Sequence, residues 1–103
     1  MTESIDGWIW GRNLRAFLEV LSLFAGYEFD DTDWRTIQAA VQDTDDENSN
    51  LWYAYPLVGV NATLEVSLAR AVGGEEMAIR VAGAETTELR LRADTLLSAF
   101  AAG

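Results

Sequence analysis

The sequence predicts an α+β domain with the architecture of a two-layer sandwich. An N-terminal helix pair is expected to pack on a three- or four-stranded antiparallel meander, followed by a short C-terminal helix. Apolar residues recur at helical spacing in the first half of the chain, whereas they alternate with polar residues in the second half. The chain has 103 residues, half of them hydrophobic, so residues 1–103 are expected to form one domain.

The first helix is expected from Arg12 onward. Its apolar stripe repeats every three or four residues and consists of Leu14, Phe17, Leu18, Leu21 and Phe24. Arg15, Glu19 and Ser22 are predicted to form its solvent-exposed edge, where Glu19 can pair with Arg15 four residues earlier. Residues 7–11 precede this helix and are interpreted as a short aromatic lead-in segment bounded by glycines.

The second helix is predicted to begin at residues 30–33. Carboxylates and a hydroxyl group there can accept hydrogen bonds from the free amides of the first helical turn. Trp34, Ile37 and Val41 repeat at helical spacing and should form the inward face. The helix is then expected to end in the polar loop of residues 43–50.

Strands are predicted for the next part of the chain. Branched or aromatic residues dominate or alternate with polar ones in residues 51–58, 63–68 and 77–82. Turns are indicated by glycines and polar residues in residues 59–61, 73–76 and 83–86. Because these turns are short, consecutive strands should be neighbours in the sheet.

Residues 86–101 fit two patterns. Leu89 and Leu91 alternate with arginines, which predicts a strand through Arg92 and then a helix that begins at Asp94. A single helix is also possible, because one helical face would contain Leu89, Ala93, Leu96, Leu97 and Phe100. The strand followed by a helix is the preferred interpretation.

The composition argues against most catalytic chemistry. The chain contains no histidine, cysteine or lysine, so the usual general bases, thiol nucleophiles and Schiff-base residues are missing. Zinc would have to rely on carboxylates alone, which is unusual. We therefore favour a non-catalytic protein and expect no catalytic residues, no cofactor and no metal site.

The charge of the chain limits its partners. Seventeen acids and seven bases give a formal net charge of −10, and every base is an arginine. Nucleic acids and anionic membranes both attract basic proteins, so neither is expected as a partner. The most apolar run, residues 16–25, is about half as long as a membrane span requires. The absence of cysteine fits a reducing compartment, and we expect a cytoplasmic, bacterial protein.

The acidic residues concentrate between Glu28 and Glu47. The loop after the second helix has the order of acids of a calcium loop, but Asn48 stands where a glycine belongs, so a solvated acidic loop is favoured. Clustered negative charge can steer a basic protein. The acids predicted to contact such a partner are Asp43, Asp45, Asp46 and Glu47.

Aromatic side chains are the second set of candidate partner contacts, because interfaces use large amphipathic rings. The residues predicted for this role are Trp8, Trp10, Tyr53 and Tyr55. Trp34 and Trp52 are expected to pack in the core or to cover an edge instead.

The arginines form a third set. If residues 88–92 form a strand, Arg80, Arg90 and Arg92 share the outer face of the sheet with Glu65 and Glu88. A cross-strand lattice of ion pairs is favoured there over a pocket for a small anion.

Three functional hypotheses follow. The favoured one is a protein-binding module with a basic partner, similar in size and charge to immunity or antitoxin-type inhibitors. The first alternative is a homo-oligomer, for example a homodimer formed through the first helix or through an outer sheet face with alanines and tyrosines. The second is a small ligand binder or enzyme that uses carboxylates and arginines, with a concave site near Glu19, Arg80 or Arg92.

Overall fold

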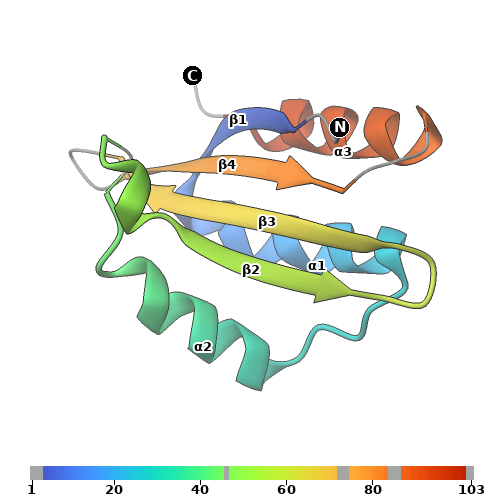
Figure 1. Cartoon of the computed structure of the whole chain (residues 1–103), viewed down its shortest axis with the longest axis horizontal. Coiled ribbons are helices and arrows are strands. Elements are labelled where there is room, and N and C mark those ends of the chain that lie inside the picture. The colour runs from blue at the N-terminus through green and yellow to red at the C-terminus, as the bar shows by residue number, and fades with distance from the viewer. Residues whose placement is uncertain (1–3, 46, 72–74, 84–86, 102–103) are drawn as a thin grey trace.

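The computed structural model of the chain describes residues 4–45, 47–71, 75–83 and 87–101 (Figure 1). In these ranges one antiparallel sheet has the strand order β1-β4-β3-β2, with β1 (Ile5–Trp10), β2 (Tyr53–Val58), β3 (Thr63–Arg70) and β4 (Glu76–Ala82). The helices are α1 (Leu14–Ala25), α2 (Asp31–Val41) and α3 (Thr87–Phe100), with short 3-10 helices η1 (Gly11–Asn13) and η2 (Ser49–Leu51). The predicted α+β fold is confirmed.

One face of the sheet forms the core. The strand register pairs Val66 with Val81 and Leu68 with Ile79, so alternate residues of neighbouring strands point to the same side. These four side chains are buried and belong to the hydrophobic core, together with Phe17, Leu18, Leu21, Ile37 and Leu97 from the three helices. The opposite face of the sheet is called the outer face below.

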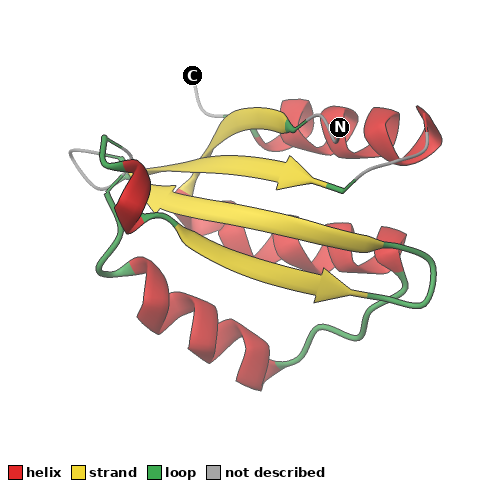
Figure 2. Ribbon diagram, in the orientation of Figure 1, coloured by secondary structure: helices red, strands yellow, loops and turns green. Residues whose placement is uncertain are grey.

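The three helices cover the inner face side by side. Figure 1 shows α1 behind the middle of the sheet, with α3 beside β1 and α2 beside β2, which agrees with the element contacts. Figure 2 shows that none of these helices crosses the outer face of the sheet. No helix in the described ranges is long and apolar enough to span a membrane.

The structure of the N-terminal segment differs from the prediction. Residues 7–11 were interpreted as a lead-in segment, but residues 5–10 form strand β1, which pairs antiparallel with β4. Gly7 interrupts the apolar alternation that would reveal the strand. A Cβ atom at this position would lie 3.1 Å from Leu97 Cδ2, so the glycine leaves room for α3 to pack closely on β1.

The structure of the C-terminal segment also differs from the prediction. The predicted strand through Arg92 is wrong, and the alternative single helix is observed as α3. Leu91 is 61% exposed, whereas Ala93, Leu96 and Leu97 are buried, which is a helical pattern of burial. The place beside β4 that a further strand would need is occupied by β1.

Two smaller differences concern single elements. Ser22 was expected on the exposed edge of α1, but it is 1% exposed and its hydroxyl group donates to the Leu18 carbonyl at 2.7 Å. Strand β2 begins at Tyr53 rather than at Leu51, because η2 precedes it and Asn48 Oδ1 accepts a hydrogen bond from the amide of Asn50 at 3.1 Å. Residues 73, 74 and 84–86 of two predicted turns lie outside the described ranges.

The turn between β2 and β3 is joined to the end of α1. The amides of Asn61 and Ala62 both donate to the Ala25 carbonyl, at 2.8 and 3.2 Å, and the Val60 amide donates to the Gly26 carbonyl at 3.3 Å. These bonds satisfy carbonyl groups that the end of a helix otherwise leaves free. The hairpin turn therefore caps a helix that lies thirty-odd residues earlier in the sequence.

Candidate functional site

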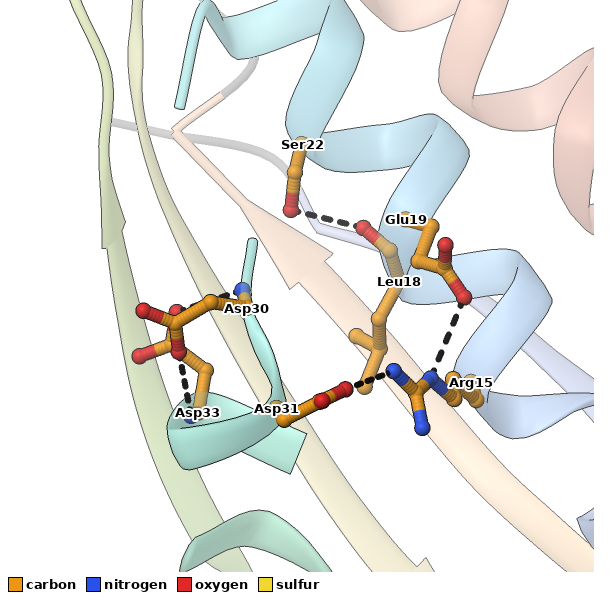
Figure 3. A network of polar contacts seen from close by, with 7 residues as sticks. All are labelled: Arg15, Leu18, Glu19, Ser22, Asp30, Asp31 and Asp33. Atoms are coloured by element: carbon orange, nitrogen blue, oxygen red, sulfur yellow. Dashed lines mark hydrogen bonds and ion pairs between the residues drawn. The ribbon is translucent and has the colours of Figure 1, made fainter. Parts of the chain in front are cut away.

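The acids at the start of α2 stabilise the fold (Figure 3). Asp30 and Asp33 form a capping box, in which each carboxylate accepts a hydrogen bond from the main-chain amide of the other residue at about 3 Å. Asp31 forms an ion pair with Arg15, which also lies 3.3 Å from Glu19. The predicted pairing of Glu19 with Arg15 is confirmed, so both carboxylates have structural partners.

Tyr55 is part of the core rather than of the surface. Its side chain is 8% exposed, and its hydroxyl group donates to the hydroxyl of Tyr27 at 3.4 Å, which in turn donates to Asp33 Oδ2 at 2.9 Å. Burial, followed by the hydrogen bond to Tyr27, raises the pKa of Tyr55. Tyr53 points to the same inner face and is half-buried against the core. The structure therefore places both predicted tyrosine contacts away from the outer face.

The loop after α2 holds the remaining acids of the predicted site. Asp43 and Glu47 are exposed, Asp45 is half-buried, and Asp46 lies outside the described residues. Asp45 Oδ1 accepts a hydrogen bond from the amide of Glu47 at 2.9 Å. Within the described ranges none of these carboxylates forms an ion pair with an arginine, and no group of three possible metal ligands is present. The positive charge beside them belongs to Arg70, which donates from Nη1 to the Gln42 carbonyl at 3.1 Å and lines a shallow hollow together with Asp45.

A hydrogen bond fixes this acidic loop to one end of the sheet. The Thr44 hydroxyl group donates to the Val41 carbonyl at 2.7 Å and accepts a hydrogen bond from the main-chain amide of Arg70 at 2.9 Å. Arg70 ends β3, and the Trp10–Glu76 pair closes the β1–β4 ladder at the same end. The acidic loop and Trp10 thus lie at the same end of the sheet.

Three tryptophans lie on or beside the outer face, and we call Trp8, Trp10 and Trp52 the tryptophan face. Trp8 is opposite Ala78, and Ala78 is opposite Ala69. The neighbours of Trp8 in this cross-strand row of the outer face are therefore small side chains. Trp8 is 44% exposed, whereas Trp10 and Trp52 are half-buried. Trp8 therefore offers the largest accessible aromatic surface of the four predicted aromatic contacts.

Arginines stack on two of these rings. The guanidinium carbon of Arg80 lies 5.0 Å from the ring centroid of Trp52, and that of Arg12 lies 5.2 Å from Trp10. Arg80 also forms an ion pair with Asp6 at 3.2 Å, across the β1–β4 ladder. Arg80 thus contacts both a carboxylate and a tryptophan on this face.

The predicted lattice of ion pairs across the sheet is wrong. Of the three arginines in this prediction, Arg80 alone lies on the outer face, and its ion pair within the described residues is with Asp6 rather than with Glu65. Arg90 and Arg92 belong to α3, where Arg92 pairs with Glu88 at 2.6 Å. The error follows from the incorrect strand, since a helix turns alternate residues to different sides.

A groove between α1 and α3 was missed at the sequence level. It has a volume of about 340 Å³, and its apolar lining consists of Phe24, Leu91, Leu96 and Ala99. Glu88 and Arg92 line one rim, and the Arg92 guanidinium carbon lies 5.4 Å from the Phe24 ring centroid. The ligand-binding alternative expects a concave site near Glu19, Arg80 or Arg92, and this groove lies beside Arg92.

Comparisons with protein-family models, with curated proteins and with solved structures found no match to this chain. Three surfaces of the described molecule could bind a partner: the acidic loop, the tryptophan face and the groove between α1 and α3.

Proposed function

We propose that this protein is a non-catalytic module that binds a basic protein. The acidic loop steers the partner, and the tryptophan face provides contact area. Such a module can act as an inhibitor that masks a basic surface of its partner. The observation that carries the proposal is that Asp43, Asp45 and Glu47 outnumber the single arginine beside them, Arg70, and form no ion pair within the described ranges, at the end of the sheet where Trp10 lies.

The distribution of ion pairs supports the choice of this loop. Asp31 and Glu19 are paired with Arg15, and Asp6 is paired with Arg80, so their charges are partly neutralised. Unpaired carboxylates produce a stronger field, which attracts oppositely charged proteins and raises association rates.

The exposed ring of Trp8 supports the choice of the second contact. Large rings that lose their solvent exposure at an interface are among the residues that contribute most to affinity. Trp8 is 44% exposed although its neighbours across the ladder, Ala78 and Ala69, are buried, so the ring lies above them on the outer side. We therefore expect the acidic loop to act mainly on association and Trp8 to act mainly on dissociation.

The test uses two variants with equal changes in net charge. The first combines Asp43→Asn, Asp45→Asn and Glu47→Gln, which keeps the oxygen that accepts the loop hydrogen bond. The control combines Glu28→Gln, Glu65→Gln and Asp94→Asn, three exposed acids without ion pairs in the described ranges. A protein cross-linked to the wild type in its source cells is identified, purified and used for stopped-flow measurements.

The loop variant should bind this partner with an association rate constant at least about tenfold lower at low salt, because steering is lost. The control variant should show a much smaller decrease, and added salt should slow the wild type toward the loop variant. Association rates that ignore both the loop substitutions and the salt concentration would contradict the proposal.

A second copy of the chain is the alternative occupant of the tryptophan face. The absence of helices from the outer face favours this alternative (Figure 2), although the tyrosines expected there lie on the inner face. Sedimentation at high micromolar concentration separates the two possibilities. Dimers that are lost in Trp8→Ala would assign the face to self-association, whereas a monomer leaves it available for the basic partner.

A further inference from the structure

We infer that the groove between α1 and α3 is a binding site for a small acidic amphiphile, a molecule with an apolar chain and a carboxylate head group. This inference is independent of the proposed protein-binding function. It concerns residues of α1, α3 and the turn before β3, none of which belongs to the acidic loop or to the tryptophan face.

The apolar half of the site would hold the chain of the ligand. Leu91, Leu96 and Ala99 come from successive turns of α3, and Phe24 closes the groove from α1. A volume of about 340 Å³ falls within the range of small-molecule sites, which are usually lined by apolar side chains with a few polar groups. Leu91 is 61% exposed here, so a ligand chain would remove apolar surface from water.

A polar hollow adjoins the apolar groove. It has a volume of about 290 Å³, and Asn61 and Leu89 line it together with three residues of the groove, Phe24, Glu88 and Arg92. The two hollows therefore share a wall. This wall consists of the Phe24 ring, the guanidinium group stacked near it and the carboxylate paired with that group. An amphiphile that spans the wall would place its chain on one side and its head group on the other.

The unpaired hydrogen-bonding groups of this wall favour a head group that accepts hydrogen bonds. Arg92 uses Nη2 for Glu88, and its other N–H groups have no acceptor among the described residues. The side-chain amide of Asn61 has no hydrogen-bond partner there either. Glu88 is already neutralised by Arg92 at 2.6 Å. Asn61 offers an acceptor as well as a donor, so the excess of free donors comes from Arg92, whose guanidinium group can donate to both oxygens of a carboxylate at once.

The site is well separated from the acidic loop. Asn61 lies in the turn before β3, while the acidic loop is bonded to Arg70 at the other end of that strand. An eight-residue strand spans roughly 25 Å, several times the screening length of about 8 Å at physiological salt. Substitutions in the loop should therefore leave the affinity of the groove nearly unchanged.

The test compares three probes with the same ten-carbon chain below their micelle-forming concentrations. They are decanoate, decanol and decyltrimethylammonium, and binding is followed by calorimetry and by amide chemical shifts. Decanoate should bind most tightly, with shifts confined to the end of α1, the turn at residues 59–62 and α3.

Two substitutions test the two halves of the site separately. Arg92→Gln should weaken decanoate binding at least about tenfold but leave decanol binding within about twofold, because it removes a charge-assisted hydrogen bond. Ala99→Trp should abolish binding of both probes by filling the groove. Ser98→Trp adds the same ring to an exposed neighbour that does not line the groove, so it should have little effect.

Several outcomes would overturn the inference. Tighter binding of the cationic probe would show that the wall selects the opposite charge. Equal binding by Ala99→Trp and Ser98→Trp would place the ligand elsewhere. Equal loss of decanoate and decanol in a folded Arg92→Gln variant would assign this arginine to the shape of the groove. Loss of decanoate binding in the acidic-loop variant would show that the two sites are not separate.

Discussion

Tyr53 and Tyr55 lie two residues apart on β2 and point to the same face of the sheet, but only Tyr55 is engaged in a hydrogen-bond chain. That chain runs through Tyr27 to Asp33 and joins the core to the capping box of α2. A buried hydroxyl group needs such a partner. At the scale of residues, Tyr55 was predicted to contact a partner protein, but its hydroxyl group instead connects the core to the capping box of α2.

The raised pKa of Tyr55 predicts a pH dependence of stability. Above pH 10 a tyrosine in the unfolded chain loses its proton, whereas buried Tyr55 retains it, so the folded state holds more protons and its stability falls as pH rises. Each such tyrosine can contribute a slope of up to about 1.4 kcal/mol per pH unit. The raised pKa of Tyr27 acts in the same direction: its bond from Tyr55 lowers the pKa, but its bond to Asp33 and burial outweigh that effect.

The measurement is urea unfolding of the wild type and Tyr55→Phe between pH 8 and pH 11. At pH 8 the variant should be less stable by no more than about 1 kcal/mol, because one long hydrogen bond is lost. This difference should shrink or reverse by pH 11, since phenylalanine cannot ionise. Tyr53→Phe is the matched control, with a hydroxyl group outside the chain. Parallel stability curves for wild type and Tyr55→Phe would refute the role of burial.

Helix α3 illustrates how an element is decided by its neighbours. The alternation of Leu89 and Leu91 with arginines is typical of a strand, and the same residues also fit a helix. The edge of β4 that could receive a strand is taken by β1, whose Ile9 lies between β4 and a bridge to Ala101. The segment therefore gains more by burying Ala93, Leu96 and Leu97 as a helix.

Alanine substitutions in α3 distinguish the two conformations energetically. In the helix Leu91 is mostly exposed, so Leu91→Ala should change the free energy of unfolding by less than about 0.5 kcal/mol. Leu96→Ala should destabilise by about 2–4 kcal/mol, because Leu96 is 7% exposed in the core. Chemical denaturation provides both values. A large effect of Leu91→Ala would instead support the buried strand position.

At the scale of the whole molecule, two distant contacts organise the functional surfaces. The turn between β2 and β3 caps α1 and places Asn61 beside the groove. At the other end of β3, Thr44 holds the acidic loop against Arg70. The longest dimension of 34 Å exceeds the screening length of about 8 Å by a factor of about four, so each surface acts in its own electrostatic environment.

The turn between β2 and β3, which caps α1, is expected to require a glycine at position 59. A Cβ atom at Gly59 would lie 2.1 Å from the main-chain oxygen of Ala25, which cannot move without displacing the end of α1. Gly59→Ala should therefore destabilise the protein by more than about 2 kcal/mol. Gly7→Ala is the control, because its Cβ atom would meet the adaptable end of the Leu97 side chain at 3.1 Å. Thermal unfolding should show the smaller loss for the control.

The sequence by itself determined the fold class, both N-terminal helices and the three-stranded meander. The capping acids at residues 30–33 and the alternation of Leu64, Val66 and Leu68 show why, since capping and burial on one face are read from neighbours along the chain. The acids of the loop and the pairing of Glu19 with Arg15 could likewise be foreseen from local patterns, whereas the exposure of Trp8 could not.

Only the tertiary structure decided β1, α3 and the buried state of Tyr55. Gly7 interrupts the apolar alternation of β1, and the reason for a glycine there is its close contact with Leu97, ninety residues later in the sequence. Residues 88–92 form a helix because β1 already occupies the edge of β4. The groove at Arg92 also exists only once α1 and α3 lie side by side. Such features depend on which distant segments compete for the same position, and no local pattern encodes that competition.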